Sequence, residues 1–221
     1  MRFFAFYASF NRLMDIISNF AVFEGGDGSG TTSQLSLLAE RFKGIKKPVF
    51  FPTFEPTDGQ IGKVIRAALK KEISLKPETM AMLFAADRNE HLHGRDGVLS
   101  RASRGELVVS DRYVLSSLVY QSIECGDELP NLLNSRFAAP EVLFFFDLDP
   151  EIALRRLQSR TTLEIYEYRE FQVKVREKYQ SLLGMYRDAG VRVQTIDASK
   201  SEQEVAQQVW SEITKMPILK Q

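Results

Sequence analysis

Residues 24–34 read EGGDGSGTTSQ and have most of the features of a phosphate-binding loop. The pattern G-x-x-x-x-G-K-[ST] surrounds phosphate oxygens with backbone amides, sets a lysine against the outer phosphates and offers a hydroxyl to Mg²⁺. Gly25 and Gly30 fit this pattern, but Thr31 occupies the lysine position and Thr32 the position of the metal-binding hydroxyl. The spacing leaves three interpretations open: a working nucleotide site, a disabled one, or a chance cluster of glycines.

Two other segments carry charges that phosphate chemistry could use, because phosphoryl transfer depends on positioning and on positive charge around the moving group. Asp111 and Arg112 follow the apolar run LVVS, and open α/β sheets bind ligands at such strand ends. Further along, Arg156 and Arg160 lie one helical turn apart, with Arg155 beside them. The alternatives are a structural ion pair at the strand end and a solvated helix face for the three arginines, which we prefer for Arg155.

Two pairs of residues spaced four apart could recognise a flat ring. Phe84 and Arg88 would project from one helix face, where a phenyl ring can stack on a base and a guanidinium can bond its edge. Ser117 and Gln121 have the same spacing, and the Gln121 amide is both donor and acceptor. Taken singly, Phe84 is more often a core residue, and a surface position is the safer interpretation of Ser117 or Gln121.

The elements that must position these residues alternate between strand and helix. Short apolar runs rich in β-branched and aromatic residues predict strands at 19–23, 48–51, 107–110, 142–146 and 191–196. Helical periodicity predicts helices at 32–42, 60–71, 77–91, 113–125, 150–160, 167–190 and 202–213. This order predicts a three-layer α/β/α fold with a central parallel sheet of about five strands. The glycine-rich turn then lies between a strand and a helix N-terminus, which is where an anion binds well.

Composition excludes several classes of function. The chain has 221 residues, 44% of them hydrophobic, which is enough for one sizeable core, and its formal net charge is zero. The net charge therefore gives no indication that the chain binds nucleic acid or an anionic membrane. Cys125 is the only cysteine, which excludes an intrachain disulfide and suits a cytoplasmic protein. His91 and His93 have no acidic or cysteine partners at ligand spacing, so we expect them at the surface.

The first 13 residues, MRFFAFYASFNRL, look appended. Their apolar runs are too short to span a bilayer, and they lack the small-residue cleavage site of a secretory signal. We expect an extension at 1–13, with Met14 as the more natural beginning, and a single domain over 14–221.

Six segments, in order, resemble the thymidylate kinase family: FEGGDGSGTTSQ (23–34), EPTDGQIGKVIR (55–66), LFAADRNEHL (83–92), SDRYVLSSLVYQ (110–121), FFFDLDPEIALRRLQSR (144–160) and IDAS (196–199). The resemblance runs from about residue 19 to residue 210. It implies a P-loop kinase that transfers the γ-phosphoryl group of ATP to dTMP, giving dTDP and ADP, with Mg²⁺ as cofactor. It also implies a homodimer and a lid over ATP at about 155–168.

The resemblance also assigns roles to individual positions. The implied catalytic residues are Arg112, Asp27 and Arg160. The implied ATP-binding residues are Gly25, Gly28, Ser29, Gly30, Thr31, Thr32, Arg156, Asp197 and Ala198. The implied dTMP-binding residues are Asp27, Glu55, Phe84, Arg88, Arg112, Ser117 and Gln121, and the implied metal-binding residues are Thr32 and Asp111. From local chemistry alone, Asp27 could equally be a turn-stabilising aspartate.

The sequence departs from the family at three positions. Thr31 replaces the loop lysine, Phe54 stands where the family often has an arginine before Glu55, and Gly28 stands where some members have a loop arginine. A catalytically silent nucleotide-binding protein therefore remains an alternative, as does a kinase for another pyrimidine monophosphate. Our hypothesis is an active enzyme in which Arg160 of the lid takes over the role of the missing lysine.

Overall fold

The computed structural model describes residues 15–157 and 169–220. The expected extension at 1–13 lies outside the described residues, as do Arg160 and most of the expected lid. The strands are β1 (Ile16–Gly25), β2 (Phe50–Phe54), β3 (Leu107–Asp111), β4 (Ala139–Asp147) and β5 (Arg192–Asp197). The helices are α2 (Thr31–Phe42), α3 (Gln60–Leu69), α4 (Pro77–His93), α5 (Val98–Ser103), α6 (Val114–Cys125), α7 (Glu128–Asn134), α8 (Pro150–Leu157), α9 (Arg169–Asp188) and α10 (Glu202–Ile213), followed by the short 3₁₀ helix η1 (Pro217–Leu219).

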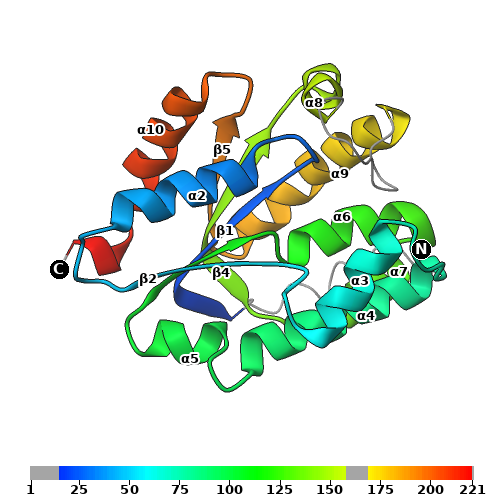
Figure 1. Cartoon of the computed structure of the whole chain (residues 1–221), viewed down its shortest axis with the longest axis horizontal. Coiled ribbons are helices and arrows are strands. Elements are labelled where there is room, and N and C mark those ends of the chain that lie inside the picture. Colours follow the sequence, from blue (N-terminus) through cyan, green and yellow to red (C-terminus); the bar gives the residue numbers. More distant parts are fainter. Residues whose placement is uncertain (1–14, 158–168, 221) are drawn as a thin grey trace.

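The centre of the fold is a parallel sheet of five strands in the order β2-β3-β1-β4-β5 (Figure 1). The predicted α/β fold with about five parallel strands is confirmed. Because β1 lies in the middle, the loop that follows it opens between the carboxyl ends of β3 and β4. Open α/β sheets bind their ligands at such a point.

Helices cover both faces of this sheet, which makes the expected three layers. Helices α2 and α10 lie on one face, and α5, α6 and α9 lie on the other (Figure 1). The run VLFFF in β4 serves both faces: Phe144 and Phe146 belong to the core under α2 and α10, whereas Leu143 and Phe145 belong to the core under α6 and α9. A strand buried on both sides is expected to be continuously apolar. Helices α3, α4 and α7 pack together beside α6.

The main differences from the predicted elements are at β1 and at two short helices; β2 and β4 also have other bounds than the predicted 48–51 and 142–146. Strand β1 begins at Ile16 rather than at residue 19, because the strand continues through an irregularity at which Asn19 has a φ of 64° and the pairing with β4 shifts register. Helices α5 and α7 were not predicted. They have 6 and 7 residues, too few turns to establish a helical period in the sequence.

Candidate active site

A cavity of about 570 Å³ opens at the carboxyl ends of β1, β2 and β3. Its volume is typical of a small-molecule site. All the residues that the resemblance assigned to the acceptor nucleotide line it: Asp27, Glu55, Phe84, Arg88, Arg112, Ser117 and Gln121. The two expected metal-binding residues, Thr32 and Asp111, line it as well. Side chains from distant parts of the sequence therefore meet in one place.

The phosphate loop joins β1 to α2 in a conformation that needs glycine. Gly28 and Gly30 have φ values of 80° and 90°, in the left-handed region that other residues rarely adopt. A Cβ at Gly28 would also lie 2.9 Å from the carbonyl oxygen of Ala153 in α8, so this loop has no room for an arginine there. Thr31 is the first residue of α2 and is buried. The unpaired amides of the first helical turn are the anion-binding feature of such loops.

Thr32 and Asp111 meet at the edge of the cavity. The Thr32 hydroxyl donates a hydrogen bond of 2.5 Å to Asp111 Oδ2, whereas Asp111 Oδ1 is buried and has no hydrogen-bond partner in the described part of the chain. P-loop enzymes hold Mg²⁺ with a loop hydroxyl and a carboxylate from a neighbouring strand, and the remaining ligands are phosphate and water. The orphaned oxygen beside the hydroxyl fits this ion, although residues 15–157 and 169–220 contain no cluster of three or more His, Cys, Asp and Glu ligands.

Arg112 lies against the phosphate loop. Its Nη1 donates to the carbonyl oxygen of Gly25 at 3.0 Å, and its Nη2 forms an ion pair of 2.6 Å with Asp27. The second oxygen of Asp27 accepts a hydrogen bond from Gln172 in α9. The ion-pair partner of Arg112 is therefore Asp27 of the loop, and its neighbour Asp111 bonds Thr32 instead. This arrangement fixes the Arg112 guanidinium between the loop and the cavity.

Arg88 is almost completely buried and makes a dense set of bonds. It pairs with the Glu55 carboxylate at 2.7 Å and donates to the Asn134 side chain, to the carbonyl of Tyr113 at 3.1 Å and to Ser117 Oγ at 3.0 Å. The side chains of Arg88 and Glu55 are only 1% and 3% exposed. Arg88 thus balances a buried carboxylate in addition to lining the cavity.

Phe84 and Gln121 complete the wall expected to hold the base. Phe84 is partly buried and packs against the core below α6. Gln121 is 2% exposed, and its amide makes no hydrogen bond to any other described residue. Ser117 is also buried, so the surface position that was the safer expectation for Ser117 and Gln121 taken singly is wrong. Ser117 and Gln121 are buried because α4 packs against α6 and α3 packs against α4. The sequence of α6 alone does not predict this packing.

His91 is not at the surface, contrary to expectation. Its side chain is 7% exposed, with Nδ1 2.9 Å from Glu55 Oε1 and Nε2 2.7 Å from the hydroxyl of Thr53. His91 lies one turn after Arg88 on α4 and bonds the other oxygen of the Glu55 carboxylate. His93 is exposed, as expected.

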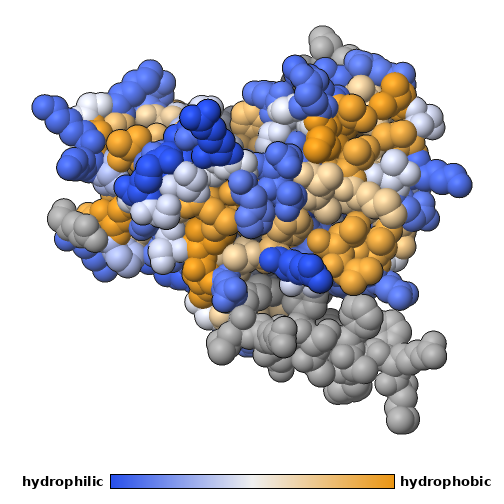
Figure 2. Space-filling model, turned by 90° about the horizontal axis from the view of Figure 1, so that it is seen from below, coloured by the Kyte–Doolittle hydropathy of each residue, from blue (hydrophilic) through white to orange (hydrophobic). Residues whose placement is uncertain are grey.

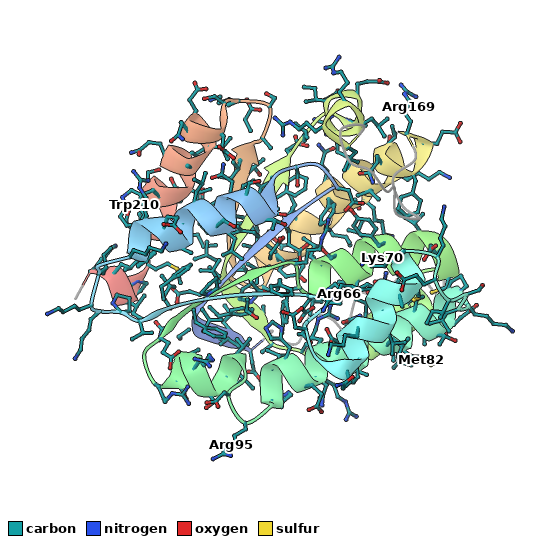
Figure 3. The ribbon with its side chains drawn as sticks, in the orientation of Figure 1. Arg66, Lys70, Met82, Arg95, Arg169 and Trp210 are labelled. Atoms are coloured by element: carbon teal, nitrogen blue, oxygen red, sulfur yellow. The ribbon has the colours of Figure 1, made fainter. Side chains whose placement is uncertain are left out.

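Two residues without a predicted role hold the loop between β2 and α3. Both oxygens of the buried Asp87 accept hydrogen bonds of 2.7 Å from Thr57, one from its amide and one from its hydroxyl. Arg66 donates to the carbonyls of Pro56 and Thr57, lines the cavity, and points from α3 toward the middle of the molecule (Figure 3). Asp87 directly precedes Arg88 in FAADR, and Arg66 ends the segment EPTDGQIGKVIR. Both residues therefore lie in segments by which the sequence resembles the family, and their position there could have identified them.

Glu24 is a further residue that the sequence analysis missed. It directly precedes the phosphate loop, is fully buried, and accepts hydrogen bonds from Tyr113, Ser116 and Tyr179. Burial raises its pKa from 4.5 to about 7, while the Ser116 hydrogen bonds, the charge of Arg112 and the Tyr179 hydroxyl oppose that rise. The signal for it is an acidic residue at the end of an otherwise apolar strand.

Three of the residues expected to bind ATP lie outside the loop itself, on α8, at the end of β5 and in the turn after it: Arg156, Asp197 and Ala198. Arg156 of α8 donates to the carbonyl of Gly28 at 3.3 Å and to that of Ala198 at 3.0 Å, so it joins the loop to the turn after β5. The Asp197 side chain accepts bonds from the amide and hydroxyl of Ser199 in the same turn. Arg155 is exposed, as expected.

Comparison with known proteins agrees with this geometry. The thymidylate kinase family model matches residues 23–209. A putative thymidylate kinase of Treponema pallidum is 40% identical over 191 residues, which cover 86% of this chain and 91% of the relative. Probable thymidylate kinases of Methanococcus aeolicus and Pyrobaculum aerophilum are 40% and 38% identical, over 76% and 86% of this chain and 80% and 93% of the relatives.

Proposed function

This chain belongs to the thymidylate kinase family and phosphorylates dTMP with ATP, and we propose how its own residues carry out that transfer. A phosphate oxygen of dTMP forms a bond to the γ-phosphorus of ATP while the bond from that phosphorus to the β–γ bridging oxygen breaks, giving dTDP and ADP. The observation that carries the proposal is the cavity in which the acceptor-site residues meet beside the Thr32–Asp111 pair.

In the acceptor site, we assign the thymine ring to the wall formed by Phe84, Arg88, Ser117 and Gln121. The Gln121 amide has no hydrogen-bond partner among the described residues, and it offers the donor and acceptor that a pyrimidine edge requires. Arg66 lines the same cavity and lies near Phe54, with its guanidinium carbon 5.9 Å from the centre of that ring. It is our candidate for the acceptor-phosphate contact that Phe54 cannot make.

In the donor site, the amides of the loop at Gly25, Gly28, Ser29, Gly30 and Thr31 surround the phosphates of ATP. Thr32 and Asp111 hold Mg²⁺, which when bound neutralises charge on the phosphate oxygens. Arg112 lies at the boundary of the two nucleotides, held in place by Asp27 and by the Gly25 carbonyl. Arg156, Asp197 and Ala198 flank the adenine end.

Because Thr31 replaces the loop lysine, another residue must supply positive charge to the outer phosphates of ATP. Arg112 and Arg156 both donate to carbonyl groups of the loop, so two guanidinium groups contact it, one from the end of β3 and one from α8. Our hypothesis that Arg160 completes the set when the lid closes stays a prediction, because Arg160 lies outside the described residues.

We also propose a homodimer in the cytoplasm. Three exposed apolar side chains support an association surface beside the cavity: Val64 on α3, Met82 on α4 and Leu132 on α7, which are 41%, 52% and 64% exposed. Figure 2 shows apolar residues gathered on the right of the molecule as drawn, and Figure 3 shows Met82 on the outside of the molecule at the lower right. Across the described residues, no helix is both long and apolar enough to cross a bilayer. Sedimentation of the parent and of Met82→Glu tests the dimer.

The experiment that tests the acceptor assignment is a coupled assay of ADP formation with dTMP, dUMP, dCMP and dGMP. We expect dTMP to be preferred, and Gln121→Ala to lower kcat/KM for dTMP by about 10- to 100-fold, the cost of losing a hydrogen bond to a buried group. The KM for ATP should not change. Gln203→Ala on the exposed face of α10 is the matched control. Binding of dTMP without ADP formation would support the silent-binder alternative.

A further inference from the structure

Arg112 adopts a backbone conformation that its own side chain disfavours. Its φ of 71° lies in the left-handed region, which a residue with a side chain occupies only where its surroundings hold it there. It is also the residue that turns the chain from β3 into α6. Two contacts from β1 hold it: the Arg112 amide donates to the carbonyl of Phe23 at 2.8 Å, and the next amide, that of Tyr113, donates to Glu24 Oε1 at 2.9 Å.

The same carboxylate serves as the cap of α6. Tyr113 is the N-cap residue of that helix and provides no side-chain cap of its own. Glu24 accepts the amide of Ser116, the third helical residue, at 3.3 Å, and the Ser116 hydroxyl at 2.5 Å. A cap normally comes from the helix's own N-cap side chain, and a negative charge at a helix N-terminus is favourable. In this fold the cap comes from the strand that leads into the phosphate loop.

Helix α9 contributes the last bond to this carboxylate. The Tyr179 hydroxyl donates to Glu24 Oε2 at 3.0 Å and is itself fully buried. Burying a carboxylate is unfavourable unless hydrogen bonds satisfy it, and an apolar side chain of similar volume is often as stable or more so. The cap of α6 is one reason for an acid at residue 24, and the left-handed backbone of Arg112 that the same carboxylate holds is a second.

We propose that Glu24 is a positioning residue that fixes the backbone of Arg112, so that the guanidinium faces the transferred phosphoryl group. Glu24 precedes Gly25, whose carbonyl receives Arg112 Nη1. Two successive residues of β1 thus set the backbone and the side chain of the same arginine. This inference rests on the proposed role of Arg112 in phosphoryl transfer.

A double-mutant cycle in kcat tests it, with Glu24→Ala, Arg112→Ala and the double variant. Arg112→Ala should lower kcat by about 100-fold or more, the scale for one lost transition-state donor. Glu24→Ala should lower kcat by about 10- to 100-fold, as a misplaced catalytic group does, with the KM values for dTMP and ATP within about twofold of the parent. In the Arg112→Ala background, Glu24→Ala should change kcat by no more than about twofold, because it acts through the residue already removed.

Two matched variants distinguish a loss of the Arg112 backbone geometry from a general destabilisation of the buried cluster around Glu24. Glu24→Gln keeps an oxygen for the two backbone amides and should retain about the parent kcat. Tyr179→Phe removes a donor that does not touch the Arg112 backbone and should do the same. If Glu24→Ala does not fold, Glu24→Asp takes its place in the cycle, since a carboxylate one methylene shorter cannot keep both amide contacts.

The inference would be overturned if the fold-losses in kcat of the two single variants multiplied in the double variant. It would also be overturned by a Glu24→Ala or Glu24→Asp variant with the parent kcat. If Arg112→Ala itself keeps full activity, the proposed role of Arg112 fails, and with it the inference. Multiplying losses with a severe Arg112→Ala variant would instead leave the role of Arg112 intact and remove only that of Glu24.

Discussion

Replacing Arg88 with methionine should separate two roles of one buried side chain. Arg88→Met keeps much of the apolar volume but leaves the Glu55 carboxylate, 3% exposed, with His91 as the remaining partner in its ion-pair network. Breaking a buried ion pair by removing one partner costs about 3–5 kcal/mol, a large part of the roughly 5–15 kcal/mol that stabilises a domain. Adding Glu55→Gln removes the stranded charge, so the double variant should be less destabilised than the sum of the two single variants.

Urea unfolding of the parent, both single variants and the double variant at one pH measures these free energies. Arg104→Met is the control: Arg104 pairs with Glu106 and Asp96 but is 47% exposed, so its loss should cost less than about 1 kcal/mol. A cost for Arg88→Met as small as that of the control, or additive losses in the double variant, would refute the reasoning about the buried pair.

The folded double variant then reports on chemistry. If Arg88 also bonds the thymine edge, kcat/KM for dTMP should remain about 10- to 100-fold below the parent, while the KM for ATP stays unchanged. A double variant that uses dTMP as well as the parent would make Arg88 a purely structural residue.

Three further predictions concern the phosphate loop and its surroundings. Because the pKa of Glu24 is raised from 4.5 to about 7, the folded state binds more protons than the unfolded state in that window, so stability falls as pH rises through it. Relative to Glu24→Gln, the parent should lose about 3 kcal/mol of unfolding free energy between those pH values, and a constant difference would contradict the shift. Thr32→Val should raise the Mg²⁺ concentration needed for half-maximal rate while leaving dTMP affinity by calorimetry unchanged; an unaltered Mg²⁺ dependence would exclude Thr32 as a ligand. Thr31→Lys should raise kcat by less than about tenfold, and a gain of several hundredfold, the scale of a missing transition-state donor, would mean that nothing replaces the lysine.

The sheet and its order of elements could be predicted because its strands are buried on both faces. A run such as VLFFF in β4 cannot be a half-exposed strand, and the helical periods on either side of it have several turns. Helices α5 and α7 are too short for this signal, and the early start of β1 depends on a local irregularity at Asn19. Such details depend on tertiary contacts, for example the hydrogen bond from the Asn19 side chain to the Ala102 carbonyl.

For the site, the sequence identified residues that line the cavity, including Asp27 and Glu55, but missed other residues that hold the backbone beside them, such as Glu24 and Asp87. The spacing of Phe84 and Arg88 is enough to place both on one face of α4, and both line the cavity. The pairing of His91 with Glu55 could not be predicted, because it joins residues 36 positions apart on separate elements. The neighbouring sequence therefore predicted a surface position for His91, whereas in the structure His91 is buried against the Glu55 carboxylate.

The absent lysine is easier to understand from how this site fixes its cations. Arg112 pairs with Asp27, Arg88 with Glu55 and Arg66 with Asp58, so each guanidinium that lines the cavity and carries a proposed role is already ordered by an acid. A lysine at residue 31 would be a flexible point charge, whereas a guanidinium has five donors in a fixed plane. One arginine can therefore hold its acidic partner, bond a loop carbonyl and still present a donor to phosphate. We therefore expect a site built on ordered arginines to transfer a phosphoryl group without the loop lysine, provided that the acids keep each guanidinium in position.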